Sequence, residues 1–479
     1  MNTPRPVRVR FAPSPTGMMH LGNVRAALLN YLFALQKQGT FILRIEDTDT
    51  QRNFDQGAQH ILHDLAWLGL SYQEGPEIGG PYAPYFQSER EAIYADHLKQ
   101  LADKQLIYRC FCSNEELEKK RQRQIALKMP PRYDRTCLKL TAEQIKENLD
   151  AHKPFIWRMR LDTFHELTIN DMAHGPITFD MKNFSDFALT RQDGSATFMF
   201  ANFVDDMVMQ ISHVIRGEDH LTNTAGQAAL YAAFKCHIPI FWHLPIICNA
   251  EGKKLSKRDF GFSLNDLRNA GYLPLAIDNY LATIGSGISN QELMLLPELS
   301  RAFNFDKMHS TGHIKYDIEK LRWLNHKWIN YLAIDELTDL CMPFLQKVYG
   351  QEAINKKTEI TKALALLRTD LHTLAEAPTL LEFYFKAPEN TTTLINECLT
   401  KDQQQKVGEL ITKHISLLSN AAEFVQVLKK ELQAQHIPLS HLFWFVRIAL
   451  MGKQQGPALH ELIEILGVDE SKKRLQAVL

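Results

Sequence analysis

The N-terminal segment constrains the fold most strongly, because it has the pattern of a strand, a loop, a helix and a second strand. Residues 7–11 alternate apolar and charged side chains, as a strand does when one face is covered. A loop rich in Pro and Gly follows, and apolar residues then recur at helical spacing until Gly39. Residues 40–45 have the pattern of the next strand. This order predicts two parallel strands joined by a right-handed crossover, and therefore an α/β domain.

The start of the predicted helix carries the first candidate functional motif. His20 and Gly22 lie where the loop becomes the helix, at the edge of the sheet where ligands of parallel sheets bind. The unpaired N–H groups of a helix N-terminus bind phosphate, and a glycine without a side chain lets a nucleotide base approach the backbone. The alternative is a capping turn with a surface histidine, which is the favoured interpretation of a His-x-Gly motif that occurs alone.

A second motif lies far along the chain. Two residues separate Lys254 from Lys257, and both lysines lie on a loop that begins at Gly252. Such lysines can close over a triphosphate and neutralise the charge that develops on a transferring phosphoryl group. A solvated basic loop or a nonspecific nucleic-acid patch is the alternative for this motif by itself. Together and in this order, the two motifs predict a site that binds ATP and transfers its adenylyl group.

Two arginines predict the chemistry of the second substrate. Arg10 ends the first strand, and Arg216 ends a later strand-like stretch, residues 208–216. A guanidinium group offers a planar fork that suits carboxylates, so two forks near one ATP site predict a substrate with two carboxylates. Glu46 would supply the complementary charge for an ammonium group. A pair of surface ion pairs is the alternative.

Three cysteines resemble part of a zinc site. Cys110 and Cys112 are followed by Cys137, but a structural zinc ion takes four ligands, and the position two residues after Cys137 holds Lys139, a poor ligand. Three free thiols are therefore the favoured interpretation. The seven cysteines are unevenly scattered and form no disulfide framework, which fits a reducing compartment.

Length and charge bound the remaining possibilities. A chain of 479 residues is too long for one core, so several domains are expected. The net charge of -1 means that a nucleic-acid partner has to be held by local patches, such as the basic, helix-prone stretch at residues 110–153. Residues 1–10 lack the apolar run of a secretory signal, and the strongest apolar stretch, residues 443–451, is too short to span a bilayer. The sequence therefore predicts a cytoplasmic protein with no membrane partner.

With these motifs in hand, the chain resembles the bacterial glutamyl-tRNA synthetases, which are class I aminoacyl-tRNA synthetases. Residues 10–23 are similar to the family's HIGH signature, and residues 254–258 resemble its KMSKS loop. Further similar segments are residues 44–49, 67–70, 87–90, 214–220, 271–274, 279–281 and 320–325.

The resemblance implies an α/β, Rossmann-like catalytic domain with a connective insertion, followed by an all-α anticodon-binding region. The implied boundaries are 1–109 for the first half of the catalytic domain, 110–184 for the insertion, 185–250 for its second half, 251–325 for a stem-contact region, and 326–479 for two helical bundles that divide near residue 385. The implied substrates are L-glutamate, tRNA and ATP with Mg²⁺, and a monomer is expected.

The resemblance also implies roles for individual residues. His20, Gly22, Lys254 and Lys257 match catalytic positions, and His20, Gly22 and Lys257 among them surround ATP. The positions that match the glutamate site are Arg10, Ser14, Glu46, Phe198, Asn202 and Arg216.

Three positions depart from the family pattern. Phe198 stands where relatives usually have a Tyr whose hydroxyl meets the amino acid. Asp370 aligns with an Arg that reads the third anticodon base in many relatives, and Met451 with a residue that is often Thr. Because Asp accepts a hydrogen bond where Arg donates one, tRNA choice is predicted to have shifted, with tRNA(Gln) as a candidate.

Four other functions are alternatives to this resemblance. Glutaminyl-tRNA synthetases are the nearest alternative, but they usually carry β-barrels where this chain is helical. A truncated paralogue that modifies a tRNA base would lack the long C-terminal part. A small-molecule nucleotidylyltransferase shares the His-x-Gly-His type of site but needs neither that region nor the basic insertion. A catalytically silent RNA-binding module would not need intact His20 and Lys254.

Overall fold

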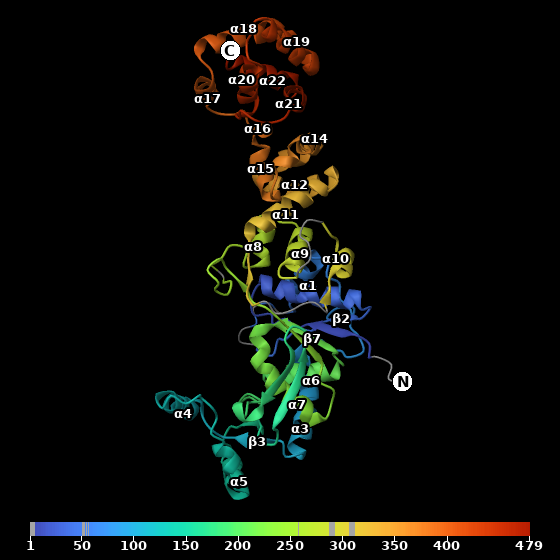
Figure 1. Cartoon of the computed structure of the whole chain (residues 1–479), viewed down its shortest axis with the longest axis vertical. Helices are drawn as coiled ribbons and strands as arrows, with labels where there is room; N and C mark the ends of the chain where they lie inside the picture. Colours follow the sequence, from blue (N-terminus) through green and yellow to red (C-terminus); the bar gives the residue numbers. More distant parts are fainter. Residues whose placement is uncertain are drawn as a thin grey trace. The chain divides into compact units, whose positions relative to one another are not determined.

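The structure is a computed structural model that describes residues 5–49, 53, 55, 57–256, 258–286, 293–305 and 312–479 (Figure 1). The chain divides into two compact units. Unit 1 comprises Met1–Leu267 with Ile277–Ile318, and unit 2 comprises Arg268–Ala276 with Glu319–Leu479.

The elements before residue 318 carry both predicted motifs. The strands are β1 Arg8–Phe11, β2 Thr40–Leu43, β3 Ile107–Cys110, β4 Ile156–Met159, β5 Glu166–Asp171, β6 Gly175–Asp180, β7 His213–Gly217, β8 Ile240–Leu244, β9 Ile247–Cys248 and β10 Ile314–Lys315. The helices are α1 Leu21–Gln36, α2 Gln59–Trp67, α3 Glu91–Asp103, α4 Asn114–Ala126, α5 Ala142–Asp150, α6 Phe198–Val208, α7 Leu221–Phe234, α8 Leu264–Asn269, α9 Pro274–Thr283 and α10 Leu296–Ala302.

Parallel strands form the centre of unit 1. β1 pairs with β2 in parallel, and α1 connects them, so the predicted strand–helix–strand unit is confirmed. β7 pairs in parallel with β8, which also meets β5, and β5 pairs with β6 in antiparallel fashion. β1 lies beside the start of β7, since the Ser212 N–H donates to the Arg8 carbonyl at 2.9 Å. The carboxyl ends of β1 and β7 therefore reach the same edge, where Arg10 and Arg216 lie.

The described part of unit 2 contains helices and no strand, as Figure 1 shows. Its helices are α11 Ile318–Tyr331, α12 Ile334–Tyr349, α13 Gln351–Asn355, α14 Lys357–Leu367, α15 Ala377–Leu380, α16 Glu382–Phe385, α17 Thr391–Cys398, α18 Lys401–His414, α19 Ala421–Ala434, α20 Leu439–Met451, α21 Leu459–Leu466 and α22 Val468–Gln476. The α/β catalytic part and the all-helical C-terminal region are thus confirmed. Across the described ranges, no helix is long and apolar enough to cross a membrane.

The predicted strand over residues 208–216 was wrong at its start. α6 continues to Val208, and the strand begins only at His213. The apolar stretch of α6 contains Asp205 and Asp206, both almost completely buried, and these carboxylates pair with arginines from other elements. Periodicity cannot distinguish a fully buried helix from a buried strand, which accounts for the error.

Asp278 on α9 leads to a prediction on stability. The residue is 2% exposed, its Oδ1 has no hydrogen-bond partner in the described part of the chain, and burial raises its pKa well above the usual value. A raised pKa in the folded state favours stability below the pKa of the unfolded chain, near about 3.9, and that contribution is lost as the pH rises. We expect Asp278→Asn to stabilise the protein by about 1–3 kcal/mol at neutral pH, and more at pH 8 than at pH 5.

Thermal unfolding of the full chain at both pH values measures this effect. Asp150→Asn, an exposed carboxylate at the end of α5, is the control and should change little. An Asp278→Asn variant that is equally or less stable at pH 8 would contradict the prediction.

Candidate active site

His20 caps helix α1. Its Nδ1 accepts hydrogen bonds from the backbone N–H groups of Gly22 at 3.1 Å and Asn23 at 3.3 Å. Burial lowers the pKa of His20, and the nearby Lys254 lowers it further, so the ring is neutral near pH 7. A Cβ added at Gly22 would lie 3.0 Å from two atoms of the His20 ring. The absent side chain of Gly22 thus leaves room for the His20 ring. His20 caps the helix, and this capping role is compatible with a role in binding a ligand.

The two sequence motifs meet in unit 1. The Leu21 N–H donates to the Phe262 carbonyl at 3.0 Å, which fixes the segment after the lysine loop against the start of α1. Lys254 is exposed, and its Nζ lies 2.9 Å from Asp219 Oδ2 in the short helical turn that follows β7. Lys257 lies outside the described residues. The site therefore combines a helix N-terminus with at least one lysine of the second motif.

Arg10 is held inside a buried cluster of charges. Its Nε and Nη2 donate to the two carboxylate oxygens of Asp206 at 3.0 and 3.2 Å. Arg44 also donates to Asp206, at 2.7 Å, and contacts Glu46 at 3.2 Å. The alternative of a surface ion pair does not hold for Arg10, since Arg10 and Asp206 are each 3% exposed. The same pairing occupies much of the Arg10 fork that was expected to meet a substrate carboxylate.

Glu46 lies beside this cluster and faces Asn202. The Asn202 amide donates to Glu46 Oε1 at 2.6 Å, and the Gln227 amide donates to Asn202 Oδ1 at 2.7 Å. Burial raises the pKa of Glu46, and the nearby Arg44 and the Asn202 hydrogen bond oppose that rise. A cationic ligand at this carboxylate would favour its charged form.

Arg216 has unused hydrogen-bond donors although it is buried. Its Nη2 donates to Thr224 Oγ1 and to Gln227 Oε1, both at 2.7 Å. Its Nε and Nη1 have no partner in the described part of the chain, and the residue is 8% exposed. Burial lowers the pKa of Arg216 to about 10, with the nearby Arg10 adding to the effect. A buried guanidinium with two unused donor groups is suited to an anionic ligand.

The remaining predicted residues of the amino-acid site lie on two elements. Phe198 begins α6, and its ring lies 5.6 Å from that of His220. Ser14 is exposed in the loop between β1 and α1, whose Pro13 carbonyl accepts from the Glu46 N–H at 2.9 Å. The sequence interpretation missed Thr224, Gln227 and Asp206. Two adjacent carboxylates within the apolar α6 were the one signal that could have indicated Asp206.

The two predicted anticodon residues lie in unit 2 and differ in exposure. Asp370 is exposed at the end of a short helical turn, Arg368–Asp370. Met451 ends α20 and is 5% exposed. A Cβ added at Gly456 would lie 2.7 Å from the Met451 sulfur, so this side chain packs against its own loop. Met451 can therefore act on a ligand mainly through the position of that loop.

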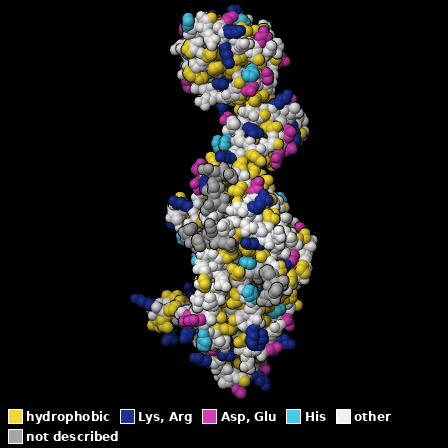
Figure 2. Space-filling view, turned by 45° about the vertical axis from the view of Figure 1, so that its right-hand side comes forward, with side chains coloured by type: hydrophobic (Ala, Val, Ile, Leu, Met, Phe, Trp, Pro, Cys, Tyr) yellow, Lys and Arg dark blue, Asp and Glu magenta, His cyan; other side chains and the backbone are white. Residues whose placement is uncertain are grey.

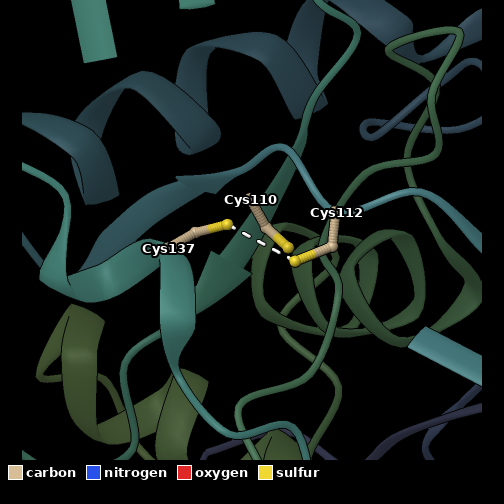
Figure 3. Close-up of side chains that lie close together, drawn as sticks. All are labelled: Cys110, Cys112 and Cys137. Carbon is tan, nitrogen blue, oxygen red and sulfur yellow. Dashed lines mark hydrogen bonds between the residues drawn. The ribbon is translucent and has the colours of Figure 1, made fainter. Parts of the chain in front are cut away.

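The three cysteines form one cluster, shown in Figure 3. Their sulfur atoms lie within 4.8 Å of one another, and the Cys112 and Cys137 sulfurs are 3.5 Å apart. The Tyr133 hydroxyl lies 3.2 Å from the Cys110 sulfur and 3.6 Å from that of Cys112. Tyr133, four residues before Cys137, thus places an oxygen beside the three sulfur atoms, which the sequence interpretation missed.

Comparisons with known proteins agree with these motifs. The family described as "tRNA synthetases class I (E and Q), catalytic domain" matches residues 6–323, and the "Anticodon binding domain" family matches residues 336–479. A glutamate–tRNA ligase of Bacillus velezensis is 36% identical over 484 residues, covering 98% of this chain and 99% of that protein. Glutamate–tRNA ligase 1 of Syntrophomonas wolfei is 38% identical, with 99% of this chain and 96% of that protein covered.

Solved structures give the same result. The crystal structure of a glutamate–tRNA synthetase from Elizabethkingia anophelis superposes with a TM-score of 0.87 at 31% identity and covers 99% of both chains. A glutamate–tRNA ligase from Elizabethkingia meningosepticum, solved in complex with its amino acid, gives a TM-score of 0.85 at 31% identity. From its sequence, its two matched domains and its fold, the chain belongs to the glutamate–tRNA ligases, which are class I aminoacyl-tRNA ligases.

Proposed function

We propose that this ligase activates L-glutamate with ATP and Mg²⁺ and transfers the glutamyl group to the 3′ end of tRNA. The observation that carries the proposal is Arg216, which is buried at the carboxyl edge of the sheet with Nε and Nη1 unpaired in the described part of the chain. The side-chain carboxylate of glutamate would satisfy these donors. Glutamine offers a neutral amide there, and a lost charge-assisted hydrogen bond costs roughly 1.5–3 kcal/mol.

The proposed reaction needs no enzyme nucleophile. The α-carboxylate of glutamate attacks the α-phosphate of ATP in line, and pyrophosphate leaves. The 2′-hydroxyl of the terminal adenosine then attacks the carbonyl carbon of the adenylate, and AMP leaves. The protein contributes positioning and charge stabilisation, which suits a site made of a helix N-terminus, lysines and fixed arginines.

The site residues divide between the two substrates. His20, Gly22, Lys254 and Lys257 are proposed for ATP and its triphosphate. The residues proposed for glutamate are Arg10, Ser14, Glu46, Phe198, Asn202 and Arg216. The Glu46 carboxylate and the Asn202 amide suit the ammonium end, while Arg216 suits the side chain. Phe198 offers a ring without a hydroxyl, so the contact that a Tyr makes in relatives is proposed to be lost.

We propose the domain boundaries that the resemblance implied. We propose a catalytic domain in two halves, 1–109 and 185–250, an insertion at 110–184 for the tRNA acceptor end, and a stem-contact region at 251–325. The helical part from 326 onward is proposed to bind the anticodon, with two bundles that divide near residue 385. Figure 2 shows Lys and Arg side chains interspersed with Asp and Glu over the visible face, in keeping with local rather than global attraction of RNA.

The choice of tRNA is the most direct test of the helical part. We expect efficient charging of purified tRNA(Gln), because the exposed Asp370 accepts hydrogen bonds where an arginine would donate them. Asp370→Arg is expected to shift the ratio of kcat/KM for tRNA(Glu) over tRNA(Gln) upward by roughly tenfold. Glu389→Arg, another exposed acidic residue of unit 2, is the control. Charging of tRNA(Glu) alone by the unaltered protein would refute the proposal.

The cysteine cluster is proposed to hold a structural zinc ion. Three sulfur atoms and the Tyr133 hydroxyl supply four donor atoms, the number that such an ion takes. This replaces the preference for three free thiols, which rested on the absence of a fourth ligand after Cys137. We expect about one zinc ion per chain by elemental analysis of the purified protein. Cys112→Ser should lower the content, and Cys236→Ser, outside the cluster, should not; a metal-free protein with normal activity would contradict the site.

We also propose that the chain is a cytoplasmic monomer. Its seven cysteines are all unpaired, which suits a reducing compartment. Light scattering coupled to size-exclusion chromatography would measure the mass, and a dimer would contradict the proposal.

A further inference from the structure

We propose that Thr224, His243 and Asp171 form a buried hydrogen-bonded relay that fixes the orientation of the Arg216 guanidinium toward the side-chain carboxylate of glutamate. These three are positioning residues, since they act through Arg216. The inference rests on the proposed role of Arg216 as a glutamate-binding residue.

The relay is continuous from Arg216 to Asp171. Arg216 Nη2 donates to Thr224 Oγ1 at 2.7 Å, and Thr224 Oγ1 lies 3.0 Å from His243 Nε2. His243 Nδ1 lies 2.7 Å from Asp171 Oδ2. Four elements contribute, since Arg216 is on β7, Thr224 on α7, His243 on β8 and Asp171 at the end of β5. The chain of contacts therefore ties the guanidinium to the rigid centre of the sheet.

The charge states give each bond of the relay a direction. Burial raises the pKa of Asp171, but hydrogen bonds from His243 and His174 outweigh that effect and bring its pKa to about 2, so it is a carboxylate. Burial lowers the pKa of His243, which is therefore a neutral ring that donates from Nδ1 to Asp171. Its Nε2 is then an acceptor for the Thr224 hydroxyl, and the Thr224 oxygen presents its lone pairs to Arg216.

A second acceptor completes the restraint on the guanidinium. Arg216 Nη2 also donates to Gln227 Oε1, so both of its hydrogens are used. Nε and Nη1 remain without a partner in the described part of the chain. Rotation of the guanidinium would break these two contacts and the longer one, 3.5 Å, from Nη2 to the His220 carbonyl. The relay thus holds two specific donor groups ready for the ligand, which lowers the ordering cost of binding.

If the three relay residues only stabilised the fold, their replacement would have different effects. Asp171 and His243 join β5 to β8, and Thr224 and His243 are fully buried, so damage to this region could loosen the whole sheet. Such loosening would affect glutamate, ATP and turnover together and would lower the unfolding temperature. The Thr224 hydroxyl also lies 3.2 Å from the His220 carbonyl. This contact between Thr224 and the backbone can persist when His243 is replaced.

The experiment measures aminoacylation kinetics with the full chain and saturating tRNA. Thr224→Val keeps the shape of the side chain and removes its hydroxyl, while Thr224→Ser keeps the hydroxyl. We expect Thr224→Val to raise the glutamate KM by roughly tenfold, in line with one lost hydrogen bond to a charged group, with the ATP KM within about twofold of normal. Thr224→Ser should restore the glutamate KM. His243→Phe should act in the same direction as Thr224→Val.

Two comparisons make the result decisive. In an Arg216→Ala background, Thr224→Val should add little further effect, because its action passes through the arginine. His213→Gln is the matched control, since His213 is a partly buried histidine on β7 that hydrogen-bonds to Ser212. It should leave the glutamate KM unchanged.

Each failure has its own meaning. If Arg216→Ala raises the glutamate KM and Thr224→Val does not, the relay is overturned and the role of Arg216 stands. If Arg216→Ala itself leaves the glutamate KM unchanged, the proposed glutamate site fails as well. Equal increases in the KM values for glutamate and ATP, not restored by Thr224→Ser, would assign the relay to stability alone.

Discussion

Arg216→Ala is expected to lower kcat/KM for glutamate by on the order of 10²–10³-fold. Its Nε and Nη1 have no partner among the described residues, and the side chain is 8% exposed, so a ligand carboxylate would bind a desolvated cation. Such contacts are stronger than exposed ion pairs because water competes weakly for the charge. The measurement is steady-state charging of tRNA over a range of glutamate concentrations, with glutamine as the competing amino acid.

The control for this variant is Arg301→Ala. Arg301 is an exposed arginine in the last turn of α10, and its loss should leave kcat/KM for glutamate unchanged. Discrimination against glutamine should fall with Arg216→Ala, because the group that distinguishes a carboxylate from an amide is gone. A variant that retains both its glutamate affinity and its discrimination would remove Arg216 from the site.

Lys257→Ala is expected to lower the turnover number by about 10²–10³-fold. This lysine lies in the segment 254–258 that resembles the family's KMSKS loop, and its proposed task is to neutralise charge on the phosphates as pyrophosphate leaves. The effect should be on kcat, because stabilisation of a transition state alone does not change substrate binding. Pyrophosphate exchange in the presence of glutamate and tRNA measures the activation step directly.

Lys253→Ala is the matched control on the same loop. The Lys253 side chain is 77% exposed and pairs with Glu251, and exposed pairs contribute little. Its replacement should leave turnover within about twofold of normal. Equal effects of the two substitutions would mean that the loop acts through its general positive charge.

The first strand–helix–strand unit of unit 1 was predictable because it depends on the local spacing of apolar residues. The strand at 7–11, the helix that starts beside His20 and the strand at 40–45 follow from the spacing of apolar side chains, and the structure confirms their order and parallel pairing. The positions of Arg10 and Arg216 at one edge of the sheet follow from the same rule. The helical character of unit 2 was also visible, since that part of the sequence has few β-branched stretches.

The partners of the charged groups were not predictable from one sequence. Arg10 is joined to Asp206, and Arg216 to Thr224 and Gln227, across elements far apart in the chain. Nothing in the local pattern indicates which of many polar residues meets a given arginine. The misplaced start of the strand at His213 has the same origin, because buried helices and buried strands are both apolar and only tertiary pairing separates them.

The contact between Lys254 and Asp219 has a consequence for how nucleotide binds. The Lys254 side chain is 60% exposed and that of Asp219 is 48% exposed, so their pairing is screened by water and costs little to break. Under the proposed role of Lys254, arriving phosphate exchanges one anionic partner of this lysine for another. Asp219 would then compete with the nucleotide phosphate for Lys254. We therefore expect nucleotide affinity to weaken with added salt less steeply than it would if Lys254 had no carboxylate partner in the free enzyme.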